Sequence, residues 1–144
     1  MATAAEPTIP PRLHPQEISF PLPKALHTTA HIHLTLLDTC AMVFLATSTP
    51  GDSAGTVKPM GSLIYAMPDL KSPTTPLSTT IYSAPSSVEY TTRVAKILAR
   101  RLRTPVYVGS SIDPTSLGLQ VEEEMEGLRQ IVEAVVKRWE AARQ

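Results

Sequence analysis

Alternation of apolar and polar residues predicts strands in the first part of the chain. The clearest run is residues 27–36, where Ala30, Ile32 and two leucines share one face, as in a half-buried strand. Residues 17–20 alternate briefly before Pro21, and this favours an edge position because proline cannot donate to a β-ladder. Residues 40–46 are apolar throughout and follow 27–36 after a three-residue turn, so we expect an antiparallel hairpin.

Two shorter strands are expected at residues 63–67 and 79–83, and helical periodicity begins after them. Ser86 and Glu89 have the S-x-x-E spacing of a capping box, which predicts a helix start near Ser87. Apolar residues then share one arc as far as about residue 103. After Pro105, residues 106–108 are apolar on both sides, so we expect a central strand there.

A second helix is predicted at about residues 117–142. Its apolar residues recur in steps of three and four from Val121 to Trp139, and either Asp113 or Ser116 is the expected cap. The element order predicts an α+β fold, a mainly antiparallel sheet with the helices at about 87–103 and 117–142 packed on it. The apolar stripe of the second helix packs on the sheet or supplies part of a dimer interface.

Length and composition favour one domain that acts inside the cell. We expect a single domain at residues 15–144 after a disordered, proline-rich tail at 1–14. The formal net charge is zero, which argues against nucleic acid as a partner, and no apolar run approaches the roughly 20 residues of a membrane span. Cys40 is the only cysteine and no secretory signal is visible, so we expect a cytoplasmic location, with the nucleus as a second candidate.

Catalytic chemistry has little support in the sequence. His31 and His33 point to one side of a strand, as two zinc ligands could, but no third ligand is evident, and a polar sheet face is the simpler interpretation. Cys40 lies in an apolar run that disfavours a reactive thiolate. Lys58 does not directly follow a glycine as in a phosphate-binding loop. We therefore predict no catalytic residue, no metal and no cofactor.

The first helix carries a separate basic stripe. It consists of Arg93, Lys96, Arg100 and Arg103. A solvated helix face is one interpretation, and docking against an acidic protein surface is the functional one.

The segment from Thr91 to Val108 resembles the helix and strand signature of the proteasome assembly chaperone 4 family. The matching residues are the run TTRVAKILARR, with its A-x-x-L-A-R-R core, followed by TPVYV, and the acidic VEEEME at 121–126 also looks like the family's ending. The chain departs from the family in its amino-terminal tail and in the proline-rich loops 50–59 and 68–76.

The resemblance implies a chaperone that is not an enzyme. It would form a heterodimer with proteasome assembly chaperone 3, bind α subunits of the 20S proteasome during α-ring formation, and leave when β subunits join. The contact residues of the family do not map individually, so the basic stripe is an independent hypothesis. Two alternatives remain open, an interaction subunit of another complex and a small metal-dependent enzyme that uses His31 and His33.

Overall fold

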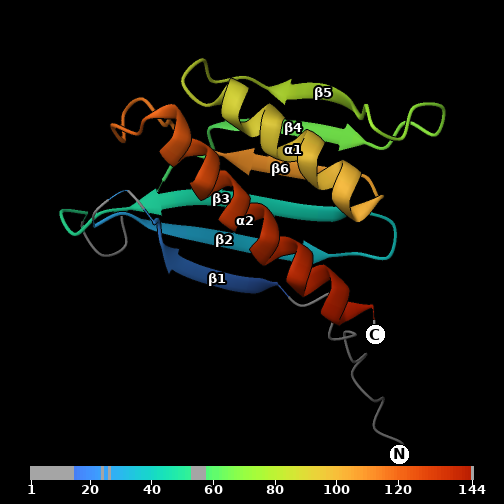
Figure 1. Ribbon diagram of the computed structural model, residues 1–144, viewed down its shortest axis with the longest axis horizontal. Coiled ribbons are helices and arrows are strands. Elements are labelled where there is room, and N and C mark those ends of the chain that lie inside the picture. Colours follow the sequence, from blue (N-terminus) through green and yellow to red (C-terminus); the bar gives the residue numbers. More distant parts are fainter. Residues whose placement is uncertain (1–14, 24, 26, 53–57, 144) are drawn as a thin grey trace, which may run out of the picture.

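The described part of the chain folds as one six-stranded sheet with two helices on the same face (Figure 1). The computed structural model describes residues 15–23, 25, 27–52 and 58–143. The predicted α+β class is confirmed, since only one pair of the strands in these ranges is parallel. The predicted tail at residues 1–14 lies outside the described residues.

The order of the strands in the sheet differs from their order in the chain. The elements are β1 (Gln16–Pro21), β2 (Thr29–Leu36), β3 (Ala41–Ser48), β4 (Ser62–Met67), β5 (Leu77–Tyr82), α1 (Val88–Leu102), β6 (Val106–Ser110) and α2 (Val121–Ala142). The strands lie in the order β1-β2-β3-β6-β4-β5. β6 is therefore central, parallel to β3 and antiparallel to β4, as its two apolar sides predicted. β2 and β3 form the predicted hairpin, closed by a hydrogen bond from the Leu37 N–H to the Cys40 carbonyl.

The core lies between the sheet and the helices. Leu34, Val43, Ile64 and Val108 of the sheet and Val94, Leu98 and Val135 of the helices have no exposed surface. Each helix buries one side and presents charged residues on the other, the pattern of a helix on a sheet. Within the described ranges, neither helix has the length and apolar character needed to cross a bilayer.

The predicted capping box of α1 does not form. Ser87 rather than Ser86 is the N-cap, one residue later than the box required, and no side chain caps the helix. The Ser87 hydroxyl instead lies 2.9 Å from the Ser62 hydroxyl, and both side chains are buried. Ser62 also bonds to the N–H and the carbonyl of Ala84. These bonds fix the start of α1 to the first residue of β4.

The start of α2 was predicted too early. Asp113 accepts hydrogen bonds from the Thr115 N–H and the Ser116 hydroxyl, but these close a turn rather than cap a helix. Gly118 then adopts a left-handed conformation with φ of 70°, which interrupts any right-handed helix. α2 begins after Gln120, which forms a capping box with Glu123.

The strand predicted from residue 27 also begins later. His27 has a φ of 64°, outside the range of a strand, and Thr28 donates a hydrogen bond to the Ala25 carbonyl. β2 starts at Thr29. His27 is therefore separated from the strand that carries the other two histidines of the predicted polar face.

Candidate protein-binding surfaces

The sheet face opposite the helices carries a band of aromatic and aliphatic side chains. Residues on this face alternate with the core positions, and directly paired residues share a face. The register therefore places Tyr65 beside Tyr107, and their ring centroids lie 4.7 Å apart. The whole band, called the open face below, comprises Met42, Phe44, Leu63, Tyr65, Met67, Leu77, Tyr82 and Tyr107.

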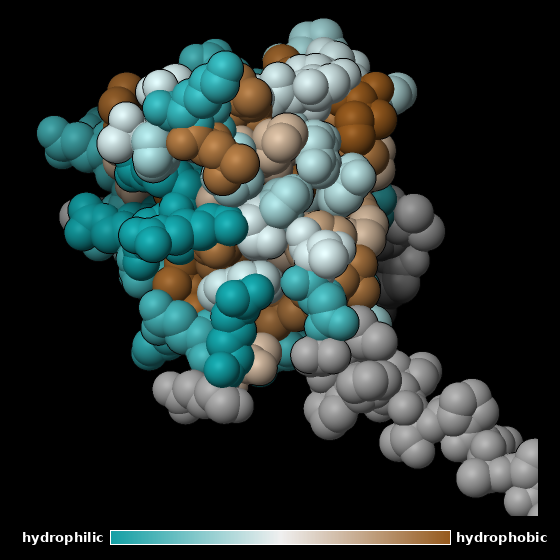
Figure 2. Space-filling view, turned by 90° about the vertical axis from the view of Figure 1, so that its right-hand side faces the viewer, coloured by the Kyte–Doolittle hydropathy of each residue, from teal (hydrophilic) through white to brown (hydrophobic). Residues whose placement is uncertain are grey.

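None of these side chains is fully buried. Met67 is 39% exposed, Leu77 52% and Tyr82 59%, whereas the others are half-buried. In Figure 2 the helix layer lies toward the left and the open face toward the right, and hydrophilic residues gather on the left while brown and tan surface follows the right-hand margin. Exposed apolar patches include sites of protein interaction, so the open face is a candidate binding surface.

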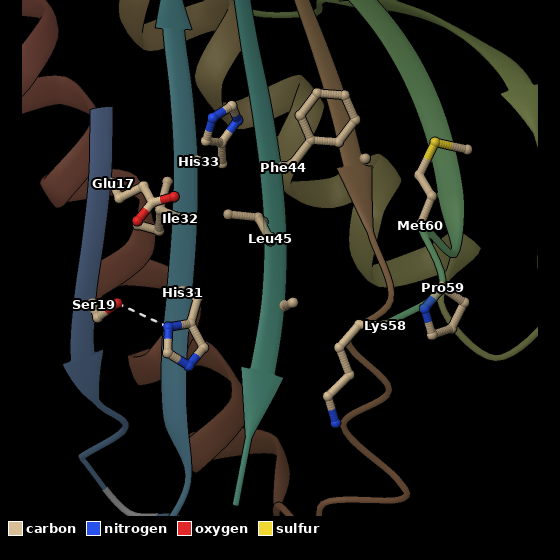
Figure 3. A pocket seen from close by; sticks show the side chains of 12 residues that line it. Glu17, Ser19, His31, Ile32, His33, Phe44, Leu45, Lys58, Pro59 and Met60 are labelled. Carbon is tan, nitrogen blue, oxygen red and sulfur yellow. Dashed lines mark hydrogen bonds between the residues drawn. The ribbon is translucent and has the colours of Figure 1, made fainter. Parts of the chain in front are cut away.

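The open face is hollowed where it reaches β1, β2 and β3. A hollow of about 440 Å³ is bounded by Glu17 and Ser19 of β1, the two histidines of β2, Phe44 of β3 and residues 58–60 (Figure 3). Gly109 lets the Phe44 ring lie close to β6 at the wall of the hollow, because a Cβ atom there would stand 2.7 Å from Phe44 Cδ1. The walls are mainly apolar and the rim is polar, so the hollow suits a side chain from a protein partner.

The two histidines of the hollow are engaged by neighbouring side chains. Both ring nitrogens of His31 are hydrogen-bonded, Nδ1 to Ser19 Oγ at 2.8 Å and Nε2 to Ser48 Oγ at 2.6 Å. The ring of His33 instead faces that of Phe44, with centroids 6.4 Å apart. In the part of the chain that the structure describes, no group of three or more His, Cys, Asp or Glu side chains is placed to hold a metal ion. The histidines belong to the polar edge of a sheet face.

The glycine-rich loop before β4 also shows no phosphate cradle in its described residues. Lys58 lies 3.0 Å from the carboxylate of Asp52, which also accepts a hydrogen bond from the Thr49 N–H at 2.8 Å. The backbone hydrogen bond from Thr49, followed by the one from Lys58, lowers the pKa of Asp52. Lys58 is therefore engaged by a carboxylate of its own loop.

The predicted basic stripe divides into two parts. Arg93 contacts Glu124 of α2 at 3.2 Å and Glu89 at 3.7 Å, so its charge is balanced within the protein. Lys96, Arg100 and Arg103 are exposed. We call these three residues the basic row. Its role in docking stays a prediction.

Sequence reasoning did not identify the open face or its hollow. The signal was present, because residues 40–46 are apolar at positions that point to both sides of the sheet. The strand order decides which side of the sheet the helices leave uncovered, and local sequence patterns do not specify the strand order.

Comparisons with known proteins agree with this architecture. The family model described as proteasome assembly chaperone 4 matches residues 29–112. A chain from "Crystal Structure of a Novel Chaperone Complex for Yeast 20S Proteasome Assembly" is similar in fold, with a TM-score of 0.61 and 16% identity. The similarity covers 87% of this chain and 97% of the yeast chain. No curated protein matches this sequence.

Proposed function

The chain belongs to the proteasome assembly chaperone 4 family, and on that premise we propose that it works by protein contact, without catalysis, as half of a heterodimer. Its partner would be proteasome assembly chaperone 3. The pair would bind α subunits of the 20S proteasome while the α-ring forms, and it would dissociate when β subunits bind at an overlapping position. We place this activity in the cytoplasm and the nucleus.

The open face is the observation that carries this proposal. Neither helix covers its central aromatic pair, Tyr65 and Tyr107. Burial of apolar surface is favourable by roughly 25 cal/mol per Å². A partner with a similar sheet would lay its own open face against this one, since two sheets pack face to face about 10 Å apart. The hollow beside Phe44 would receive one of its side chains.

Coexpression with the partner chaperone tests this assignment. We expect Tyr65→Glu to abolish the heterodimer, because the contact would bury an unpaired carboxylate. Leu70→Glu is the matched control, since Leu70 is 94% exposed in the loop before β5. Size and mass measurements should show the heterodimer for Leu70→Glu and separate chains for Tyr65→Glu. A heterodimer that survives Tyr65→Glu in a folded protein would exclude the open face as the contact.

The basic row is the proposed contact for an acidic surface of an α subunit. Lys96, Arg100 and Arg103 are exposed on the helix side of the molecule, opposite the open face, so both contacts can form at once. Exposed charges mainly steer association and set orientation, and salt screens them.

A charge-reversal experiment separates the basic row from general charge effects. The triple variant Lys96→Glu, Arg100→Glu and Arg103→Glu should weaken α-subunit binding by about tenfold or more at low salt and leave the heterodimer intact. The control reverses three exposed cations outside α1, Lys71, Arg129 and Lys137, and changes the net charge equally. Equal binding by both triple variants would remove the basic row from the proposal.

A further inference from the structure

The strand β5 forms one edge of the sheet and is exposed along its whole length. All six of its residues are exposed, including Leu77 at 52%, Ile81 at 53% and Tyr82 at 59%. Among the described strands, β4 is its single neighbour in the sheet. No backbone hydrogen bond between described residues reaches its outer side. The backbone groups on that side are therefore available to another strand.

The features that usually protect an edge strand are largely missing from β5. At the opposite edge, β1 carries Glu17, ends at Pro21 and is followed by Pro23, and Arg138 of α2 bonds to Gln16 at its start. β5 itself contains neither proline nor charge, although Pro76 directly precedes it, and no charged residue occurs from 72 to 88. Its sequence, LSTTIY, is also rich in residues that favour strands. A β-bulge at one end is its main irregularity.

We propose that β5 pairs with β5 of a second copy of this chain, antiparallel and about a two-fold axis, so that two sheets become continuous. An identical strand is a suitable occupant because the uncharged edge brings no repulsion from like charges. This contact goes beyond the proposed function and is independent of it. The open face stays free, so two heterodimers would be joined.

The side-chain pattern limits the possible registers. Residues opposite each other must share a face of the sheet, and Leu77 and Thr79 lie on the open face while Ser78 and Thr80 lie on the helix side. The axis must therefore pass through a residue rather than between two. Centring it on Thr79 pairs Thr79 with its own copy and Ser78 with Thr80. It also brings Leu77 to the bulged end of the second strand, where Ile81 is 53% exposed.

The contact should be weak. A bulge lies between the pairs that Leu63 and Ile64 form with β5, and it limits the regular edge to Leu77–Thr80. A contact along so short an edge would bury at most about 1,200 Å² of surface, which is the range of transient contacts. We therefore expect dimers to form reversibly as the concentration rises into the micromolar to millimolar range.

Charge substitutions at Thr79 test both the pairing and the register. Sedimentation of the full chain should show dimers at high concentration, and Thr79→Lys should weaken them about tenfold or more because two lysines would face each other across the axis. Thr79→Glu should do the same. An equimolar mixture of the two variants should restore dimers, because an introduced lysine would then face an introduced glutamate across the axis. The control Thr75→Lys adds the same charge in the exposed loop before β5 and should dimerise like the parent.

Three results would overturn the proposal. A parent chain that stays monomeric up to about 0.5 mM would exclude the contact. Equal weakening by Thr79→Lys and Thr75→Lys would show an effect of net charge. A mixture of the Lys and Glu variants that stays monomeric would exclude the register. Tyr65→Glu distinguishes this contact from the proposed heterodimer, because it should leave β5 pairing unchanged.

Discussion

The two faces of the sheet are built from the same strands but differ in what covers them. On β3, Val43 is fully buried beneath the helices, while the next residue, Phe44, is only half-buried on the open face. On β4, Ile64 and Tyr65 show the same contrast. Both faces are apolar, so hydrophobicity alone does not distinguish the core from a binding surface. The covered face holds the chain folded, whereas the open face is free for the partner that we propose.

Truncation on the covered face should produce the largest loss of stability. Leu98 on α1 has no exposed surface, so Leu98→Ala should lower the free energy of unfolding by about 3 kcal/mol, the sum of lost burial and a residual cavity. Urea denaturation of the isolated chain measures this loss.

Phe44→Ala is the matching change on the open face. It should lower the free energy of unfolding of the isolated chain less than Leu98→Ala does, because the Phe44 ring is only half-buried. It should nevertheless weaken the heterodimer more than Leu98→Ala does. Equal losses of stability for the two variants, with equal binding, would contradict the division between the faces.

A buried polar contact on the covered face gives the second largest effect. Ser62→Ala would leave the Ala84 N–H and the Ser87 hydroxyl without their partner, whereas the Ala84 carbonyl keeps the hydrogen bonds from the N–H groups of Ser87 and Val88. Each unsatisfied buried group costs about 1–3 kcal/mol before relaxation, so we expect a loss of about 2 kcal/mol. Thermal unfolding would measure it, with Ser78→Ala on exposed β5 as the control. A loss no greater than the control's would show that Ser62 does not hold the start of α1.

Local pattern was sufficient to predict most elements of this fold. The period of the apolar residues identified the strands, both helices and the hairpin, and the two apolar sides of residues 106–108 identified a central strand. The errors fell at ends set by backbone conformation, such as Gly118 before α2 and His27 before β2. The pattern of apolar residues does not reveal which residue adopts a left-handed backbone conformation.

The candidate binding surfaces were much less predictable. Arg93 looked like part of an exposed stripe because its partner, Glu124, lies 31 residues away and meets it only when α2 packs beside α1. The open face depends on β6 lying between β3 and β4, a long-range arrangement. Local patterns specify which residues share a face, whereas tertiary packing decides whether that face is covered.

A single methyl group can test the shape of the open face without changing its polarity. In Gly109→Ala the new Cβ would stand 2.7 Å from Phe44 Cδ1 and 3.3 Å from Met60 Cγ, so the ring must move. Because the ring borders the open hollow, the loss of stability should be about 1 kcal/mol or less. The free energy of heterodimer binding, measured by titration calorimetry, should weaken by more than this loss of stability. Unchanged affinity would show that the position of Phe44 does not shape the contact.

The smallest effect should come from the exposed surface of the helix layer. Arg101 donates a hydrogen bond to Glu133 at 2.8 Å, and this bond lowers the pKa of the Glu133 carboxyl from its ordinary value of 4.5. A carboxyl with a lowered pKa in the folded state stabilises the fold above its unfolded pKa, and that contribution is lost as the pH falls through the folded pKa. The stabilisation by this bond is therefore fully present at pH 7 and decreases below about pH 4.5.

Glu133→Gln should accordingly lower the melting temperature slightly at pH 7, and the difference from the parent should vanish in acid. The control is Glu17→Gln, which removes an exposed carboxylate on the other side of the sheet. Because Glu133 lies on the outer side of α2, heterodimer affinity at pH 7 should not change. A difference in melting temperature that persists at low pH would show that Glu133 acts through packing rather than charge, and a loss of affinity would place the helix layer in the partner contact as well.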